Sequence, residues 1–326
     1  MLKCTLITDD KIGNIHPATG LAEKLSEHIS LTIHHLKVRK SLILYFFPLF
    51  ILRLCPPLIP KLLGPISGPI NEFSDIIIGN GSASVKYCAA LRIFYRASHK
   101  KSFFIQLQNP SISSAYFDLV IPPMHDHVRG ENIISTLGAL THINVEKIAA
   151  AKVPYQILEL RPPIYAVFIG GRSKRHAFSP DDAEKLARDL KIFMVQNKCA
   201  LAITTSRRTG AEQIKVLQKI IGTHNVYFWD GQTENPYFAM LKYCDKAIVT
   251  ADSVNMISEI ATAGLQMLLY PMRGRDGKFK YFYNMLKRRA YIQDFTHNPV
   301  FMRPPKRLDE IERILPDILQ HLKEVL

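Results

Sequence analysis

One stretch in the C-terminal half most constrains the fold of the chain, because it reads as a complete strand–turn–helix–strand unit. Residues 245–272 are DKAIVTADSVNMISEIATAGLQMLLYPM. An apolar strand at 247–250 leads into a polar turn, and the helix that follows ends at Gly264, before a second apolar strand at 267–270. Such units build parallel sheets, with the helix N-terminus facing the carboxyl edge of the strands. Open α/β sheets bind ligands at that edge, and the N–H groups of a helix start favour an anion.

The polar side chains of this turn and helix indicate half of a nucleotide or nucleotide-sugar site. A carboxylate just inside the helix can accept hydrogen bonds from a ribose diol, and Glu259 has that position. The other candidates in this unit are Ser253, Asn255 and Ser258.

The rest of the chain repeats the alternation of short apolar runs and helical patterns. In the first half we predict strands at 4–8, 31–36, 75–78, 102–106, 119–121 and 132–136, and helices at 17–29 and 83–96. In the second half we predict strands at 165–169, 200–204 and 225–228, and helices at 181–197, 211–221 and 235–242. This order predicts an α/β fold of two tandem Rossmann-type, doubly wound parallel-sheet domains with a cleft between them.

We place the domain boundary where prolines interrupt the periodicity. Lys152-Val153-Pro154 and Arg161-Pro162-Pro163 lie there, so the expected domains are residues 1–155 and 156–326. The first would take the acceptor and the second the nucleotide sugar. A chain of 326 residues is long enough for two domains with cores of their own.

The formal charge of +14 leaves three kinds of partner open: nucleic acid, an anionic membrane or an anionic small substrate. The chain has no nucleic-acid motif and no zinc spacing, so we expect no nucleic-acid partner. It has no GxGxxG, so we expect no nicotinamide and no other cofactor. Five widely spaced cysteines and an N-terminus unlike a signal peptide favour a cytoplasmic location, with peripheral contact at the inner face of a membrane as an extension.

The segment 42–63 is strongly apolar, but four prolines and Arg53 interrupt it, and it is too short between charges to span a bilayer. Two interpretations stay open. It forms a buried helix and loop, or it forms an interfacial patch with apolar side chains in lipid and cations at the headgroups. The patch would consist of Phe46, Phe47, Phe50 and Leu54, flanked by Arg39, Lys40, Arg53 and Lys61.

Two loops of the second half end strands beside the 245–272 unit and offer groups that bind anions. Gly170-Gly171-Arg172 follows the first strand of that half, where small residues and a cation could cradle a pyrophosphate. Thr204, Ser206 and Arg207 lie at the end of the next strand. Because parallel strands share one carboxyl edge, we expect these loops and the Ser253–Glu259 turn to form one anionic-ligand site.

The first half has weaker candidates at its own strand ends. Lys11, Gly13 and Asn14 lie in the loop after the first strand, with His16 two residues further on. Gly81 and Ser82 end the strand at 75–78 and would line an acceptor side. His125 is a candidate general base, and the HxH pair that it forms with His127 has too few ligands to predict a metal site.

Four segments together resemble the family of the plant mitochondrial-fission protein named for elongated mitochondria, and its bacterial relatives. They are FDLVIPPMHDHVRGENIISTLGALTHI (117–143), ITTSRRTG (203–210), FWDGQTENPY (228–237) and VTADSVNMISEIATAG (249–264). The resemblance extends over nearly the whole chain, and this family is similar to the GT-B glycosyltransferase superfamily. In the peptidoglycan lipid-intermediate N-acetylglucosaminyltransferases, a Ser and a Glu of this turn contact the nucleotide sugar. The resemblance carries these roles to Ser253 and Glu259, and matches Gly170 and Gly171 to the glycine loop.

The chain departs from that pattern in its first loop. Bacterial relatives resemble the glycosyltransferases in a Gly-His pair there, whereas this chain has Gly13-Asn14. Since Asn is no general base near neutral pH, His16 or His125 would have to act in catalysis. The resemblance therefore implies a metal-independent GT-B-type glycosyltransferase that uses a nucleotide-sugar donor, with a lipid-linked or lipopolysaccharide-type acceptor. The alternative is a non-catalytic, membrane-associated adaptor on the same fold.

Overall fold

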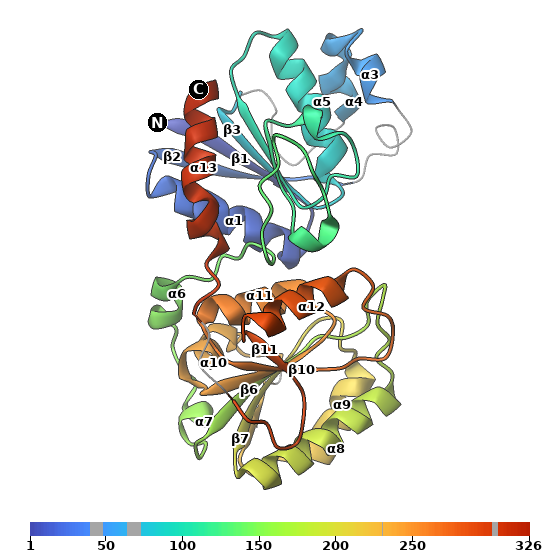
Figure 1. Ribbon diagram of the computed structural model, residues 1–326, viewed down its shortest axis with the longest axis vertical. Helices are drawn as coiled ribbons and strands as arrows, with labels where there is room; N and C mark the ends of the chain where they lie inside the picture. Colours follow the sequence, from blue (N-terminus) through green and yellow to red (C-terminus); the bar gives the residue numbers. More distant parts are fainter. Residues whose placement is uncertain (40–47, 64–72, 230, 302–305) are drawn as a thin grey trace. The chain divides into compact units, whose positions relative to one another are not determined.

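The computed structural model describes residues 1–39, 48–63, 73–229, 231–301 and 306–326. The chain divides into two compact units, each built on a parallel sheet of its own (Figure 1). Unit 1 consists of Met1–His142 and Asp309–Leu326, and unit 2 of Ile143–Leu308.

Unit 1 has a five-stranded sheet in the order β2-β1-β3-β4-β5, with every pair parallel. Its strands are β1 (Leu2–Thr8), β2 (Leu31–Lys37), β3 (Ile76–Asn80), β4 (Phe103–Leu107) and β5 (Leu119–Ile121). Its helices are α1 (Ile12–Ser26), α3 (Leu49–Leu52), α4 (Ile59–Leu63), α5 (Ser84–Ala97) and α13 (Glu310–Val325). Short 3-10 turns lie at Pro56–Leu58, Ser114–Tyr116 and Met124–Asp126.

Both faces of this sheet are buried, because successive side chains of a strand point to opposite sides. Ile76 and Ile78 of β3 join a core with α1 and α13, whereas Ile77 between them joins a second core with α3, α4 and α5. The continuous apolar runs of the strands follow from this double burial.

The C-terminal helix belongs to unit 1, which differs from the expected division into 1–155 and 156–326. Ile314, Ile318 and Leu322 of α13 are buried in the same core as Leu21 and Leu25 of α1. The first unit also ends at His142, before the prolines that suggested the boundary. The amphipathic face of α13 needs an apolar partner, and α1 with the sheet of unit 1 provides it.

Unit 2 has a six-stranded parallel sheet in the order β11-β10-β9-β6-β7-β8. Its strands are β6 (Ile164–Ile169), β7 (Ala200–Thr205), β8 (Val226–Phe228), β9 (Lys246–Thr250), β10 (Met267–Tyr270) and β11 (Ile292–Asp294). Its helices are α6 (Val145–Ala150), α7 (Tyr155–Leu158), α8 (Pro180–Asn197), α9 (Ala211–Ile221), α10 (Tyr237–Tyr243), α11 (Val254–Ala263) and α12 (Phe279–Arg288). Figure 1 shows α8 and α9 on one face of this sheet and α11 and α12 on the other.

Two predicted elements differ from the structure. The segment 132–136 makes only isolated bridges, Val120 with Ile133 and Pro123 with Thr136, and is no regular strand. Helix α1 begins at Ile12, so Pro17 lies inside the helix instead of in its first turn.

The described residues of the segment 42–63 are partly buried and partly exposed, and the membrane-interface interpretation stays a prediction. Leu49, Leu52 and Ile59 are buried in the core under α5, whereas Phe50 and Leu54 are 64% and 82% exposed. Lys40, Phe46 and Phe47 lie outside the described residues, and so does the side chain of Lys61. Among the helices of the described ranges, none is long and apolar enough to cross a membrane.

Each sheet has one point where the strand order reverses direction. In unit 2 this point lies between β6 and β9, and in unit 1 it lies between β1 and β3. Ligands of open α/β sheets bind beyond the carboxyl ends of the strands at such a point. The loops that follow these four strands therefore define where a site is expected.

Candidate functional site

In unit 2 the loop after β6 is tied directly to the turn after β9. The Gly170 N–H donates to Thr250 Oγ1 at 2.8 Å, and the Gly171 N–H donates to Asp252 Oδ2 at 3.1 Å. Thr250 Oγ1 in turn donates to Asp252 Oδ1 at 2.6 Å. A Cβ on Gly170 would overlap the Asp252 carboxylate, so only glycine permits this approach. At the switch point of unit 2, the Asp252 carboxylate thus occupies the space beside Gly170 and Gly171.

Asp252 is a residue that the sequence analysis missed. Its side chain is fully buried, and Arg208 Nη2 lies 2.7 Å from Asp252 Oδ2 as its ion-pair partner. The two glycine amides that were expected to cradle a pyrophosphate therefore donate to groups of the chain. The sequence does contain a signal for this residue, because Asp252 comes directly after the end of a buried strand whose neighbour ends in a Gly-Gly pair.

The loop after β7 packs on the same glycines. Ser206 Oγ donates to the Gly170 carbonyl at 2.9 Å, and the Arg172 N–H donates to the Arg208 carbonyl at 3.1 Å. Thr204 is buried in β7, while the Arg207 side chain is exposed. The structure therefore brings the glycine loop, the β7 loop and the β9 turn together, as expected.

Helix α11 places the remaining predicted residues. Ser253 is its N-cap and accepts a hydrogen bond from the Met256 N–H at 3.3 Å. Asn255 is half-buried in the first turn, and Ser258 is fully buried. Ser253 thus has a clear structural role at the start of this helix, next to Asp252.

Glu259 lies in the second turn of α11 and is held by a tyrosine. The Tyr237 hydroxyl donates to Glu259 Oε2 at 2.6 Å. Burial and the neighbouring carboxylate raise the pKa of Tyr237 well above its ordinary value, so the phenol stays a donor. Tyr237 also contacts the Phe168 ring of β6, at 4.8 Å between centroids. The carboxylate is therefore positioned by a partner that the sequence analysis did not single out.

In unit 1, Asn14 in the first turn of α1 joins the loop after β1 to the end of β3. Asn14 Nδ2 donates to Asp9 Oδ1 at 2.7 Å, and the Asn14 carbonyl accepts from Asn80 Nδ2 at 2.8 Å. Gly81 has a φ of 89°, and a Cβ there would overlap the Asn14 amide. The residue that replaces the expected histidine thus binds the two carboxyl-edge loops of unit 1 together.

The two candidate bases of unit 1 differ in accessibility. The His16 ring is half-buried on α1 and lies against the His142 ring, with 3.6 Å between centroids. His125 is only 4% exposed, with Nε2 at 3.8 Å from Asp126 Oδ1. Of the other acceptor-side candidates, Gly13 is half-buried, Ser82 is exposed, and Lys11 pairs with Asp9 at 3.0 Å.

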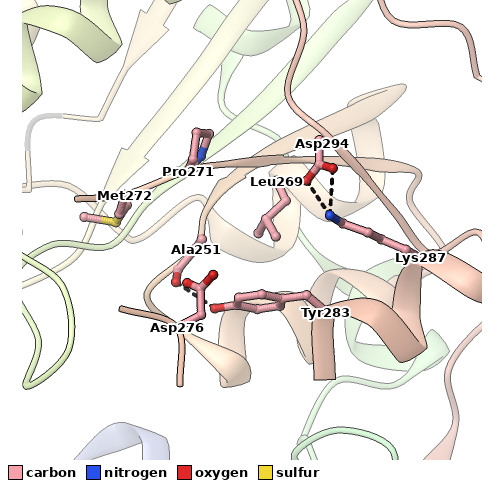
Figure 2. Close-up of a pocket in the computed structure, with 8 residues that line it drawn as sticks. All are labelled: Ala251, Leu269, Pro271, Met272, Asp276, Tyr283, Lys287 and Asp294. Atoms are coloured by element: carbon pink, nitrogen blue, oxygen red, sulfur yellow. Dashed lines mark hydrogen bonds and ion pairs between the residues drawn. The ribbon is translucent and has the colours of Figure 1, made fainter. Parts of the chain in front are cut away.

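Unit 2 also has a small cavity of about 110 Å³ beside the β9 turn (Figure 2). The Tyr283 hydroxyl of α12 donates to the Ala251 carbonyl at 2.7 Å, and Lys287 Nζ lies 2.6 Å from Asp294 Oδ1. The other lining residues are Leu269, Pro271, Met272 and Asp276. Ala251 precedes Asp252, so the cavity borders the switch-point loops, and its polar lining was not predicted.

Solved structures share this fold at low sequence identity. The UDP-GlcNAc 2-epimerase of Methanocaldococcus jannaschii matches with a TM-score of 0.58 and 10% identity, over 98% of this chain and 100% of its own. MurG of Acinetobacter baumannii matches with a TM-score of 0.51 and 15% identity, over 100% of this chain and 93% of its own. The two parallel-sheet units and these likenesses define a GT-B-like fold.

Within that fold class, the chain belongs to the family described as mitochondrial fission ELM1, whose model matches residues 12–322. The mitochondrial fission protein ELM1 of Arabidopsis thaliana is 27% identical over 68% of this chain. The aligned part spans 57% of the plant protein's length. The uncharacterised protein RP120 of Rickettsia prowazekii is 26% identical, over 98% of each chain.

Proposed function

We propose that the chain is a metal-independent GT-B-type glycosyltransferase whose nucleotide-sugar donor binds to unit 2. The observation that carries the proposal is the junction of three predicted loops at the switch point between β6 and β9, with Glu259 held beside it by Tyr237. The epimerase of the same fold in complex with UDP-GlcNAc and UDP, with a TM-score of 0.52, supports a donor of this class.

Each group of the site has a distinct part in this proposal. Glu259 would accept hydrogen bonds from the ribose hydroxyls, and the N–H groups at the start of α11 would face the diphosphate. Because Thr250 and Asp252 engage the Gly170 and Gly171 amides, the charge on the leaving diphosphate would be balanced mainly by Arg172 and Arg207.

On the acceptor side, burial of His125 favours His16 as the general base. His16 would take the proton of an acceptor hydroxyl while its oxygen bonds to the anomeric carbon and the nucleoside diphosphate leaves. The exposed Phe50 and Leu54 support a lipid-linked acceptor and a peripheral position at the inner face of a membrane.

The test is calorimetric titration with a panel of nucleotide sugars, on the natural chain and on Glu259→Gln. A glutamine still accepts a hydrogen bond from Tyr237, so the substitution isolates the carboxylate charge. Loss of a hydrogen bond to a charged group should weaken binding by about tenfold or more. The control Glu212→Gln makes the same change on the exposed side of α9 and should leave the affinity unchanged.

Two outcomes contradict the proposal. One is that no nucleotide sugar of the panel binds the natural chain. The other is that Glu259→Gln binds as tightly as the natural chain does. If His16 is the base, the His16→Gln variant should still bind the nucleotide sugar but should not transfer it. The His125→Gln variant should still transfer the sugar.

A further inference from the structure

Two loops of unit 2 carry a dense group of cations that the proposed transfer reaction does not use. The first precedes α8, and the second precedes α12 and continues into its first turn. Together they are called the basic face, and their six cationic side chains are exposed. These side chains are Lys174, Arg175, Arg273, Arg275, Lys278 and Lys280. Asp276 is the only acid in residues 173–178 and 271–281, and Asp182 of α8 forms an ion pair with Arg273 at 3.1 Å.

Backbone hydrogen bonds join the two loops into one surface. The Ala177 N–H donates to the Arg273 carbonyl at 2.9 Å, and the Arg275 N–H donates to the Arg175 carbonyl at 3.2 Å. His176 and Gly274 form an antiparallel bridge between these contacts. The cations of both loops are therefore fixed near one another.

A buried histidine lies at this junction and contacts its acid. The His176 side chain is fully buried, and its Nε2 lies 3.1 Å from Asp276 Oδ1. Gly277 has a φ of 53°, and a Cβ there would overlap the Arg175 guanidinium. Asp276 therefore faces the histidine that anchors the loops.

Two of the six cations lie at a helix start that disfavours positive charge. Lys278 is the N-cap of α12 and Lys280 lies in its first turn, which contains no acid. The helix dipole repels positive charge at that end. A surface that gathers six exposed cations gains from an anionic partner.

The accompanying aromatic side chains point to lipid as that partner. Tyr281 is 42% exposed on α12, and the Arg175 guanidinium lies 5.0 Å from the centre of the Phe279 ring. Amphipathic aromatic side chains beside lysine and arginine are typical of a membrane interface. We infer that the basic face binds the surface of an anionic lipid bilayer, independently of the transferase activity proposed above.

The test compares two triple variants of equal charge in vesicle co-sedimentation. Lys174→Glu, Arg275→Glu and Lys280→Glu together reverse three charges of the basic face. The control Lys191→Glu, Lys215→Glu and Lys219→Glu reverses three exposed charges on α8 and α9, outside the basic face. The vesicles contain phosphatidylcholine alone or with phosphatidylserine.

The natural chain should bind only the vesicles with phosphatidylserine, and less tightly as salt rises. Each cation near an anionic surface strengthens binding by about fivefold, so the first variant should lose on the order of a hundredfold. The control should retain most of its binding. Equal losses in both variants, or no binding by the natural chain, would overturn the inference.

A second measurement avoids substitutions altogether. An amine-reactive reagent should modify Lys174 and Lys280 more slowly when phosphatidylserine vesicles are added, with Lys215 and Lys219 unchanged. If the vesicles slow the modification of all four lysines equally, or of none, the inference is overturned. So does tighter binding to duplex DNA than to the vesicles at the same salt, if the first variant abolishes it.

Discussion

At the scale of single residues, the Asp252 side chain connects the loops after β6 and β7 to the turn after β9. We predict that Asp252→Asn destabilises the protein by about 2 kcal/mol, because it removes a buried charge–charge contact and weakens two hydrogen bonds. Arg208 is 40% exposed and regains water, which limits the loss. Urea unfolding measures the change.

Asp181→Asn is the matched control, because Asp181 is exposed in the first turn of α8. It should cost only a fraction of a kcal/mol, through the helix dipole. If both substitutions had the same effect on the unfolding free energy, the proposed role of Asp252 would be wrong.

Asp9 provides a test by pH. Burial opposes its ionisation, but hydrogen bonds from Asn14 and Lys11 outweigh this and hold its pKa below the ordinary value. A lowered folded-state pKa contributes stability that is present above about pH 4 and is lost as pH falls through the folded-state pKa. Asp9→Asn should therefore reduce the fall in melting temperature below about pH 4.

The exposed Asp317 of α13 supplies the comparison for this experiment. Asp317→Asn should leave the acid response of unit 1 unchanged. An identical acid response in the Asp9 variant and the natural chain would contradict the coupling between Asp9 and Asn14.

Residue types and strand ends were enough to predict which loops of unit 2 meet, but not how their polar atoms pair. Gly170, Ser206 and Ser253 were named as ligand contacts, whereas the structure gives each of them a bond within the chain. Asn14 stands where the related pattern has a histidine, and in the structure it connects the loop after β1 to the end of β3. Such pairings depend on the spacing between loops that are distant in sequence, which no local pattern contains.

At the scale of elements, α13 completes a core that begins at the other end of the chain. Ile318 is fully buried there, so Ile318→Ala should destabilise unit 1 by about 3 kcal/mol through lost burial and a residual cavity. Ile192→Ala makes the same change in α8 at a side chain that is 44% exposed, and should cost far less. Hydrogen exchange followed separately in the two units would locate the loss in unit 1.

Long periodic elements were predicted well and the C-terminal helix was not. The helix predicted at 181–197 is α8, and the strand predicted at 267–270 is β10. Pro316 interrupts the apolar spacing of α13, and this helix is absent from the predicted elements. Even a correct helix prediction would not show which sheet the helix packs on. An amphipathic face indicates that one side is buried, but it does not identify the element that covers it.

At the scale of the whole molecule, only unit 2 is continuous in sequence. We predict that residues 143–308 fold alone, whereas residues 1–142 need residues 309–326 added as a peptide or by a linker. The Leu137 N–H donates to Glu310 Oε2 at 2.6 Å, and the α13 side chains fill the core beside α1. Circular dichroism melting tests this, and a fragment 1–142 that melts identically with and without the peptide contradicts it.

The return of α13 to the first sheet also sets an order of events during synthesis. The nascent N-terminal sheet leaves the ribosome with the α13 side of its core uncovered, and it stays so while all of unit 2 is being translated. Unit 2 can complete its folding first, although domains generally fold from the N-terminus onward. Over that interval, a chaperone that shields the apolar side chains of α1 and the first sheet would act on the first half of the protein and not on the second.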